Sequence, residues 1–265
     1  MELTGRTVLL TGATGGLGRA IATALADRGA ALILSGRDAG ALEALITELP
    51  GDGHTSAPAD LAEEGEAERL ISEHPGIDVL VANAGLPASG RLDGFSQDQI
   101  GRALRVNLES PIRMARALIP PMQERGGGHL VFVSSISGRI STPRASIYAA
   151  TKFGLRGFAL NLREDLRRTG VGVSVVSPGT IREAGMFAES GAKPPPGLGT
   201  GTPRQVAAAV VKAIERNRGE ISVAPRRQRA LASVSMFAPE LSGRVAGSAA
   251  TKVADEVARG QTDKR

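Results

Sequence analysis

The segment YAATK places Tyr148 and Lys152 four residues apart in a stretch with a helical pattern. Residues at this spacing share one face of a helix, so the two side chains can lie together. Free tyrosine, with a pKa of about 10, is a poor base at neutral pH. An ammonium about 4 Å away would favour the phenolate by roughly 4 kcal/mol at an effective dielectric constant of about 20, which corresponds to about three pKa units. The pair therefore predicts a tyrosine that acts as general acid or base.

Tyr148 is the only tyrosine among the 265 residues, and the chain has no tryptophan. The pair alone is equally compatible with a half-buried helical tyrosine beside a solvated lysine, so other motifs must decide between the two interpretations. The chain also has no cysteine, which excludes disulfides, thiolate metal sites and cysteine nucleophiles. We predict no metal site.

A second chemical feature lies near the N-terminus, where LTGATGGLGRA (residues 10–20) holds four glycines within seven residues. Glycine loses more backbone entropy on folding than any other residue, so this composition needs a reason. An apolar run precedes the glycines and an amphipathic one follows, which predicts a turn between a strand and a helix. Phosphates can approach such a turn because side chains are absent and the helix N-terminus offers free N–H groups. We expect a phosphate site rather than a linker or a structural turn, and no Gly-Lys-Ser/Thr follows to indicate a P-loop.

Short apolar runs alternate with longer amphipathic segments over residues 5–225. Strands are expected at residues 7–12, 30–36, 54–60, 77–85, 129–135, 171–179 and 220–225. Helices are expected at residues 17–28, 39–49, 61–73, 96–124, 146–168 and 203–217. Continuous Val, Leu and Ile runs are typical of strands buried on both faces, as in a parallel sheet. We therefore predict an α/β fold, a single-domain Rossmann-type doubly wound sheet of about seven parallel strands flanked by helices.

Two segments depart from this alternation. Residues 180–203 hold too much Pro and Gly for a regular element, and we expect them to form a substrate lid. Apolar residues spaced by three or four over residues 226–247 predict an amphipathic helix with a break at Pro239. We accordingly divide the chain into a dinucleotide-binding and catalytic domain (1–225) and a C-terminal helical extension (226–265). The extension could dock on the lid, form a subunit contact or lie on a membrane surface, and we favour protein packing.

Charge and hydropathy narrow the classes of partner. The net charge is +5, with an excess of basic residues after residue 203, but no nucleic-acid-binding motif or basic–aromatic pattern accompanies it. No apolar run approaches the roughly 20 residues of a membrane-spanning helix. A strand-like run begins within the first residues and leaves no room for a signal peptide. We expect a cytoplasmic protein without a nucleic-acid partner.

The order of motifs along residues 5–225 resembles the short-chain dehydrogenase/reductase family. The matching motifs are Thr11-Gly12-x-x-x-Gly16-x-Gly18, Asp60-Leu61, Asn83-Ala84-Gly85, Ser135 at 13 residues before Tyr148, Tyr148-x-x-x-Lys152 and Pro178-Gly179. The resemblance implies a nicotinamide-dependent oxidoreductase with the catalytic residues Ser135, Tyr148, Lys152 and Asn107. Its implied cofactor-binding residues are Gly12, Thr14, Gly16, Leu17, Gly18, Arg37, Asp60, Leu61, Asn83, Ala84, Gly85, Tyr148, Lys152, Pro178, Gly179 and Ile181.

Two of these assignments have simpler alternatives. Ser135 is expected to bond the substrate oxygen and stabilise charge there, but serines are common at strand ends, and only the spacing distinguishes it from Ser134. Asn107 is unusual inside a helix, and Pro111 has no N–H to donate to its carbonyl. The resemblance implies that Asn107 holds a water linking the lysine to solvent, whereas a plain proline kink is the alternative.

The second expected strand ends in LSGRD, with Gly36 where an acidic residue would bind a ribose 2′-hydroxyl. Arg37 follows, and its guanidinium could pair with a 2′-phosphate. We predict NADP(H) in preference to NAD(H); a surface arginine is the alternative.

The sequence departs from the family pattern after Pro178-Gly179. Glu183 stands where many relatives have a Thr that contacts the nicotinamide amide, which leaves Thr180 as the nearest candidate. Apolar residues of the lid and of the segment after Ser135 predict a small hydrophobic carbonyl or alcohol substrate; they are Ile181, Met186, Phe187, Pro194 to Pro196, Ile136, Ile140 and Pro143. The resemblance also implies a homodimer or homotetramer.

Other classes remain open at this stage. An epimerase or dehydratase of the same family would keep these residues, and a cofactor-sensing regulatory protein would be expected to have lost Tyr148, Lys152 or Ser135. A hydrolase is disfavoured because there is no G-x-S-x-G motif and no histidine lies in a recognisable base motif.

Overall fold

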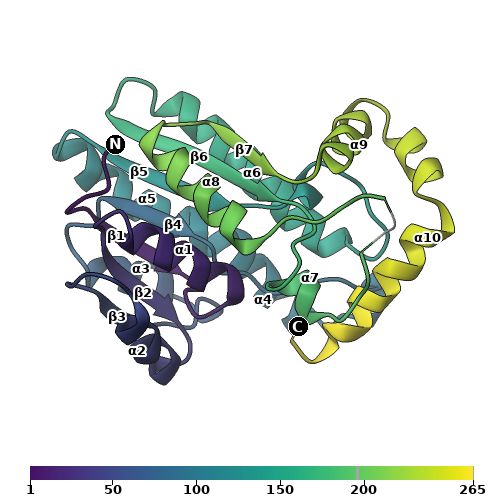
Figure 1. The fold of residues 1–265 in the computed structure, drawn as a ribbon, viewed down its shortest axis with the longest axis horizontal. Coiled ribbons are helices and arrows are strands. Elements are labelled where there is room, and N and C mark those ends of the chain that lie inside the picture. Colours follow the sequence, from purple (N-terminus) through teal and green to yellow (C-terminus); the bar gives the residue numbers. More distant parts are fainter. Residues whose placement is uncertain (195–196, 265) are drawn as a thin grey trace.

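The computed structural model describes residues 1–194 and 197–264, apart from the side chains of residues 239, 241–250 and 264. Pro195 and Pro196 of the expected lid therefore lie outside the described residues. Seven parallel strands form one sheet in the order β3-β2-β1-β4-β5-β6-β7 (Figure 1). Their bounds are β1 Thr7–Thr11, β2 Ala31–Gly36, β3 Thr55–Pro58, β4 Val79–Ala82, β5 Gly128–Val133, β6 Val171–Pro178 and β7 Glu220–Val223. The predicted doubly wound parallel sheet is confirmed.

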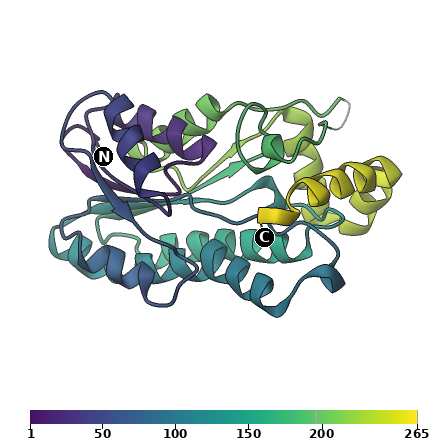
Figure 2. The same ribbon diagram turned by 90° about the horizontal axis from the view of Figure 1, so that it is seen from below.

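Helices cover both faces of this sheet. Figure 2 shows the purple and green helices on one side and the blue and teal helices on the other. One core layer packs under α1 (Gly16–Ala26), α2 (Ala39–Glu48) and α8 (Pro203–Glu215). The opposite layer packs under α3 (Glu66–Ser72), α5 (Ser110–Glu124) and α6 (Ser146–Asp165). Because both faces are covered, successive residues such as Val8, Leu9 and Leu10 of β1 are all fully buried, which explains the unbroken apolar run.

The strand order reverses direction between β1 and β4, which lie side by side at the centre of the sheet. Chain segments leaving the carboxyl ends of these two strands diverge, and ligands of open α/β sheets bind in the crevice formed there. The glycine-rich turn follows β1, and Asn83-Ala84-Gly85 follows β4. The fold therefore brings two of the sequence motifs to one edge of the sheet.

The structure corrects two helix predictions and one loop prediction. The helix expected at 61–73 begins only at Glu66, because Asp60 Oδ1 accepts a hydrogen bond from Ala62 N in a turn before it. The helix expected at 96–124 is divided into α4 (Gln97–Leu104), a π-turn (Arg105–Glu109) and α5. The lid, expected to be irregular, contains one short helix, α7 (Met186–Glu189).

Two helices follow the last strand, α9 (Arg226–Phe237) and α10 (Pro239–Gly260), and a short 3-10 turn (Thr262–Lys264) comes after them. The break falls at the predicted proline, but α10 continues well beyond the expected residue 247. Figure 1 shows α10 running back from α9 to end beside α7. No helix in the described part of the chain is both long and apolar enough to span a membrane.

A partly buried ion-pair cluster joins β7 to the segment after β5 and to α6. Glu220 of β7 pairs with Arg139 and accepts hydrogen bonds from Arg156 Nε at 2.8 Å and Nη2 at 3.1 Å. All three side chains are at most 20% exposed. Burial by itself would raise the pKa of Glu220, but the two guanidinium groups outweigh it and hold that pKa below its usual value of 4.5. The cluster fixes α6 relative to the carboxyl edge of the sheet.

We predict that Glu220→Gln lowers the free energy of unfolding at pH 7 by roughly 1–3 kcal/mol, because it leaves two partly buried guanidinium groups without their carboxylate. A carboxyl with a lowered folded-state pKa stabilises the protein above its unfolded pKa and loses that contribution as pH falls through the folded pKa. The difference between wild type and variant, measured by urea denaturation, should narrow as the pH is lowered below 4.5.

The control is Glu164→Gln, which removes the exposed pair with Arg167 and should change stability little. An equal loss in the two variants, or a Glu220→Gln effect that does not vary with pH, would contradict the account.

Candidate active site and cofactor cavity

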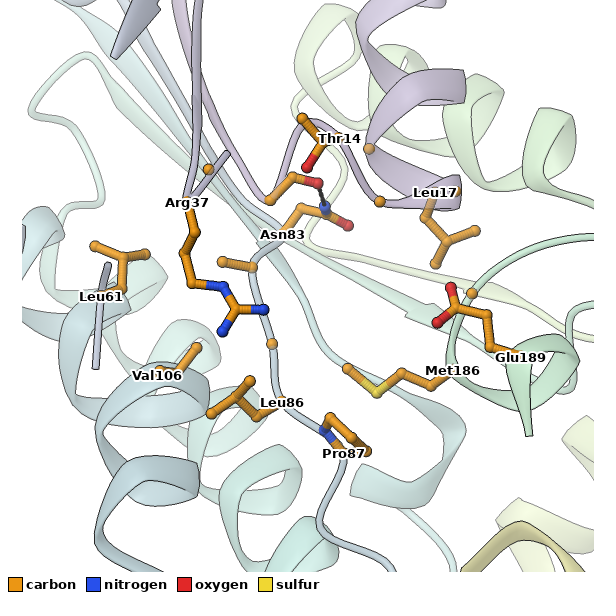
Figure 3. A pocket seen from close by; sticks show the side chains of 18 of the residues that line it. Thr14, Leu17, Arg37, Leu61, Asn83, Leu86, Pro87, Val106, Met186 and Glu189 are labelled. Atoms are coloured by element: carbon orange, nitrogen blue, oxygen red, sulfur yellow. Dashed lines mark hydrogen bonds between the residues drawn. The ribbon is translucent and has the colours of Figure 1, made fainter. Parts of the chain in front are cut away.

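Two cavities open at the carboxyl edge of the sheet, one of about 570 Å³ and one of about 550 Å³. The first, shown in Figure 3, lies over the turn after β1 and between the ends of β2, β3 and β4. The second lies over the ends of β5 and β6 and under the lid and the C-terminal helices. Seven residues line both cavities: Leu17, Asn83, Gly85, Pro87, Gly185, Met186 and Gln261. The cavities therefore meet at a common junction.

The glycine-rich turn forms the wall of the first cavity with almost no side chains. Gly12 has a positive φ of 64°, and a Cβ on it would lie 2.8 Å from Cα of Ala84. A Cβ on Gly18 would collide with the carbonyl oxygen of Gly12, so the turn can close only with glycine at both positions. Gly15 caps α1 without any side-chain hydrogen bond, which leaves the first N–H groups of this helix for a ligand. This cradle fits a dinucleotide pyrophosphate.

Asn83 connects the ends of β4 and β1. Its Nδ2 donates to the carbonyl oxygens of Thr11 and Gly12, both at 3.1 Å, and Thr11 Oγ1 accepts from the main-chain N–H groups of Asn83 and Ala84. The amide nitrogen of Asn83 is thus committed to the glycine-rich turn. Asn83 shapes the cavity mainly by holding two main-chain segments together.

Arg37 lies at the far end of the first cavity. Its exposed side chain extends from the end of β2 between Leu61 and Asn83 (Figure 3). Among the described residues no carboxylate forms an ion pair with it, since the neighbouring Asp38 instead caps α2 by accepting from Ala41 N. Asp60 and Leu61 line the same end. The guanidinium is therefore free to bind an anion.

The second cavity brings Ser135, Tyr148 and Lys152 together with apolar side chains. Its apolar lining comes from the segment after β5, the lid, α9 and α10: Ile136, Ile140, Pro143, Ile181, Met186, Phe187, Leu198, Leu231, Val253 and Val257. Pro178, Gly179 and Thr180 also line it. The polar groups stand at one side of a largely apolar space, as in a site for a small apolar ligand.

The two adjacent serines have different surroundings. Ser134 is buried, and its hydroxyl donates to the carbonyl oxygen of Lys152 at 3.0 Å, which ties α6 to the end of β5. Ser135 is half-buried, faces Tyr148, and its Oγ accepts from Ser137 N at 3.1 Å. Because this bond uses an oxygen lone pair, the Ser135 hydroxyl proton can still be donated to a ligand. Ser134 has a structural role that the sequence left open.

Lys152 is buried beside Tyr148, with Nζ 5.8 Å from the centre of the ring and donating to Val133 O at 3.0 Å. Burial lowers the pKa of Lys152 to about 8, so it is still mostly protonated at pH 7. Burial raises the pKa of Tyr148, and the hydrogen-bonding interaction with Ser135 opposes that rise only in part. Lys152 does not contribute to the shift in the pKa of Tyr148 in the chain alone, so the lowering expected from the lysine charge is absent there.

Asn107 lines neither cavity, although it lies directly behind Gly85 at their junction. It is fully buried, and its side chain bonds the main chain of Leu86 at both ends: Oδ1 accepts from N at 2.7 Å and Nδ2 donates to O at 2.9 Å. It lies within the π-turn, in which Ser110 N donates five residues back to Arg105 O. Such turns are frequent at functional sites, and Pro111 cannot continue the usual ladder. The side chain thus supports the loop at the junction.

At the start of the lid, Glu183 occupies the position at which many relatives have a threonine that contacts the nicotinamide amide. Glu183 is exposed, pairs with Arg182 at 2.8 Å and lines neither cavity. Thr180 lines the second cavity, and its N–H donates to Gln228 Oε1 at 3.2 Å. Ile181 is buried and pairs with Gly201 in an isolated bridge at the other end of the lid.

Sequence reasoning missed the contribution of the C-terminal helices. Gln228 of α9 donates to Gly199 O at 2.8 Å, and Gln261, directly after α10, donates to Met186 O at 3.1 Å. Arg144 Nε donates to Asp255 Oδ1 of α10 at 2.6 Å. The extension is thus docked on the lid, one of the three arrangements left open. The apolar spacing of α9 indicated a helix but gave no signal for its partner.

Comparisons with known proteins agree with this geometry. The sequence profile of the family described as short chain dehydrogenase matches residues 6–195. The chain is 35% identical over 227 residues to the ketoacyl reductase HetN of Nostoc sp.. The aligned region covers 83% of this chain and 79% of that protein.

Solved structures give the same result. A short-chain dehydrogenase from Sphingobium yanoikuyae in complex with NADPH aligns with a TM-score of 0.77 at 26% identity, over 91% of this chain and 96% of that one. A metagenomic short-chain oxidoreductase in complex with NADP aligns with a TM-score of 0.70 at 29% identity, over 85% of this chain and 99% of that one.

We predict that Tyr148 in the protein without added cofactor titrates above pH 10, because burial penalises the phenolate. Absorbance at 295 nm reports phenolate, and with one tyrosine and no tryptophan the signal belongs to this residue alone. Urea-unfolded protein should titrate at about 10 and serves as the control. A midpoint in the folded protein at or below that of the unfolded chain would contradict the environment described here.

Proposed function

This chain belongs to the short-chain dehydrogenase/reductase family, and on that premise we propose that it is an NADP(H)-dependent oxidoreductase that interconverts a small apolar ketone or aldehyde and the corresponding alcohol. One observation carries the proposal. A phosphate cradle and an apolar cavity with a Ser-Tyr-Lys group meet at a shared junction, so one ligand can reach from Arg37 to Tyr148.

The first cavity would hold the cofactor. The N-terminus of α1 and the glycine-rich turn would bind the pyrophosphate, and Asp60 and Leu61 would lie at the adenosine end. Arg37 would pair with a 2′-phosphate, and the absence of an ion pair with any carboxylate of the described residues supports this role. Two of the similar solved structures are described as complexes with NADPH or NADP, which favours the same cofactor here.

A bound nicotinamide would supply or accept the hydride. The side chains of this chain would bind the substrate oxygen and transfer the proton to or from it. Tyr148 is protonated at pH 7, the state needed to give a proton to a carbonyl oxygen during reduction. The Ser135 hydroxyl would donate to the same oxygen and stabilise the charge that develops on it. The protonated Lys152 lies on the same helix face and would favour the phenolate that Tyr148 becomes after transfer.

Asn107 would complete the proton path. A Cβ on Gly85 would lie 3.2 Å from Asn107 Oδ1 and 3.8 Å from Lys152 Nζ, so the two residues lie on either side of this glycine. Because the Asn107 side chain is already engaged by Leu86 and Thr151, we propose that its main-chain carbonyl, which Pro111 cannot engage, holds a water that reprotonates Lys152.

The substrate would bind in the second cavity. Its lining is predominantly apolar, and Ser135 and Tyr148 provide polar groups where a carbonyl could be oriented. We also propose a homodimer or homotetramer. Leu104 of α4 and Phe153 of α6 support it, because both are large apolar side chains left 40% or more exposed on neighbouring helices.

Replacing the proposed acid tests the enzyme class. We expect wild type to oxidise NADPH with members of a panel of apolar ketones, followed at 340 nm, and Tyr148→Phe to lower kcat by roughly 10²- to 10⁴-fold. NADPH binding should persist in the variant. Absence of turnover by wild type across the panel, or undiminished turnover by Tyr148→Phe, would refute the proposal.

Arg37→Glu tests the cofactor preference. Loss of a charge-assisted contact with the 2′-phosphate should reduce the ratio of kcat/KM for NADPH to that for NADH by roughly 10- to 100-fold. Arg167→Glu makes the same change of charge on an exposed residue outside both cavities and should leave the ratio unchanged. An unchanged ratio in Arg37→Glu would show that this arginine does not bind the 2′-phosphate.

A further inference from the structure

Gln261 is a buried glutamine whose amide is only half satisfied. The residue is 4% exposed, and its Nε2 donates to the carbonyl oxygen of Met186 in α7. Its Oε1 is buried and has no hydrogen-bond partner among the described residues. Buried polar atoms normally have a partner, so an acceptor left without one calls for a donor that the described part of the chain does not provide.

The main chain holds Gln261 firmly in this position. A Cβ on Gly260 would collide with the carbonyl oxygen of Ser190, so the end of α10 is pressed against the end of α7. Together with the bond to Met186, this contact fixes where the side chain lies. The half-satisfied amide is therefore a consequence of a tightly packed contact rather than of a loose terminus.

Gln261 lies at the junction of the two cavities. It is one of the seven residues that line both, and of these only Asn83 and Gln261 have polar side chains. The amide nitrogen of Asn83 is already bound to Thr11 and Gly12. Gln261 Oε1 is thus a buried acceptor, without a partner among the described residues, on a side chain that lines the junction of the cavities.

We propose that Gln261 Oε1 accepts a hydrogen bond from the nicotinamide half of the cofactor, so that the C-terminal extension completes the cofactor site. The inference rests on the proposed function. A ligand extending from the glycine-rich turn to Tyr148 must cross the junction, and the portion that does so is the ribose and the nicotinamide. Both carry donors, the ribose hydroxyls and the carboxamide N–H₂ group. Ionised phosphates and an apolar ketone carry none.

Two probes separate this role from mere docking of the helix. NADPH contains the nicotinamide half, and 2′-phosphoadenosine 5′-diphosphate lacks both the nicotinamide ring and its ribose while keeping the adenosine and phosphate groups. Dissociation constants for both would be measured by calorimetry on wild type and on Gln261→Met, which has a similar shape but no amide. Gln123→Met, on an exposed residue of α5, is the matched control. Melting temperatures verify that each variant is folded.

We expect Gln261→Met to weaken NADPH binding by roughly 5- to 30-fold and 2′-phosphoadenosine 5′-diphosphate binding by less than about twofold. Equal weakening of both probes would overturn the inference, because it would show that Gln261 only docks the extension on α7. Unchanged binding of both would overturn it as well. If wild type bound neither probe, the proposed function itself would fail, and this inference with it.

Discussion

Close contact between main-chain segments at the carboxyl edge of the sheet is the constraint on which the rest of the structure depends. The turn after β1 lies against the segment after β4, and Thr11, Gly12, Asn83 and Ala84 hold the two together. Only glycine fits at the tightest point, because a Cβ there would strike Ala84. The same lack of side chains that permits this contact leaves the N-terminus of α1 open to an anion. The glycines that the fold requires are thus the same ones that would let a phosphate approach the main chain.

A second set of contacts places the polar chemistry opposite that cradle. Ser134 fastens α6 to the end of β5, and Glu220 fastens it to β7 through Arg156. Tyr148 and Lys152 are carried on the helix so held, while Ser135 stands on the adjoining segment. The lid and the C-terminal helices then cover the space between, with Gln228 and Gln261 as their anchors. Each anchor bonds main-chain atoms of the lid.

Sequence patterns predicted all seven strands and the position of most helices, because parallel strands buried on both faces leave unbroken apolar runs. The late start of α3 and the π-turn around Asn107 were missed, since each depends on a single local hydrogen bond rather than on periodicity. The sequence predicted a lowered pKa for Tyr148, whereas burial raises it in the chain alone. The spacing of two residues does not show how deeply they are buried. No sequence pattern indicated a role for Gln261, because the position of its side chain depends on the contact between α10 and α7.

The central claim is that the two cavities together direct a hydride from cofactor to substrate carbon. The most direct measurement is the reduction of an apolar ketone with NADPH carrying two deuterium atoms at C4 of the dihydronicotinamide ring. The account predicts a secondary alcohol with one deuterium on the carbinol carbon, detected by mass spectrometry, and stoichiometric formation of NADP⁺. Product formed without deuterium and without net oxidation of the cofactor would contradict it, and would point to an enzyme that binds the cofactor but performs no net reduction.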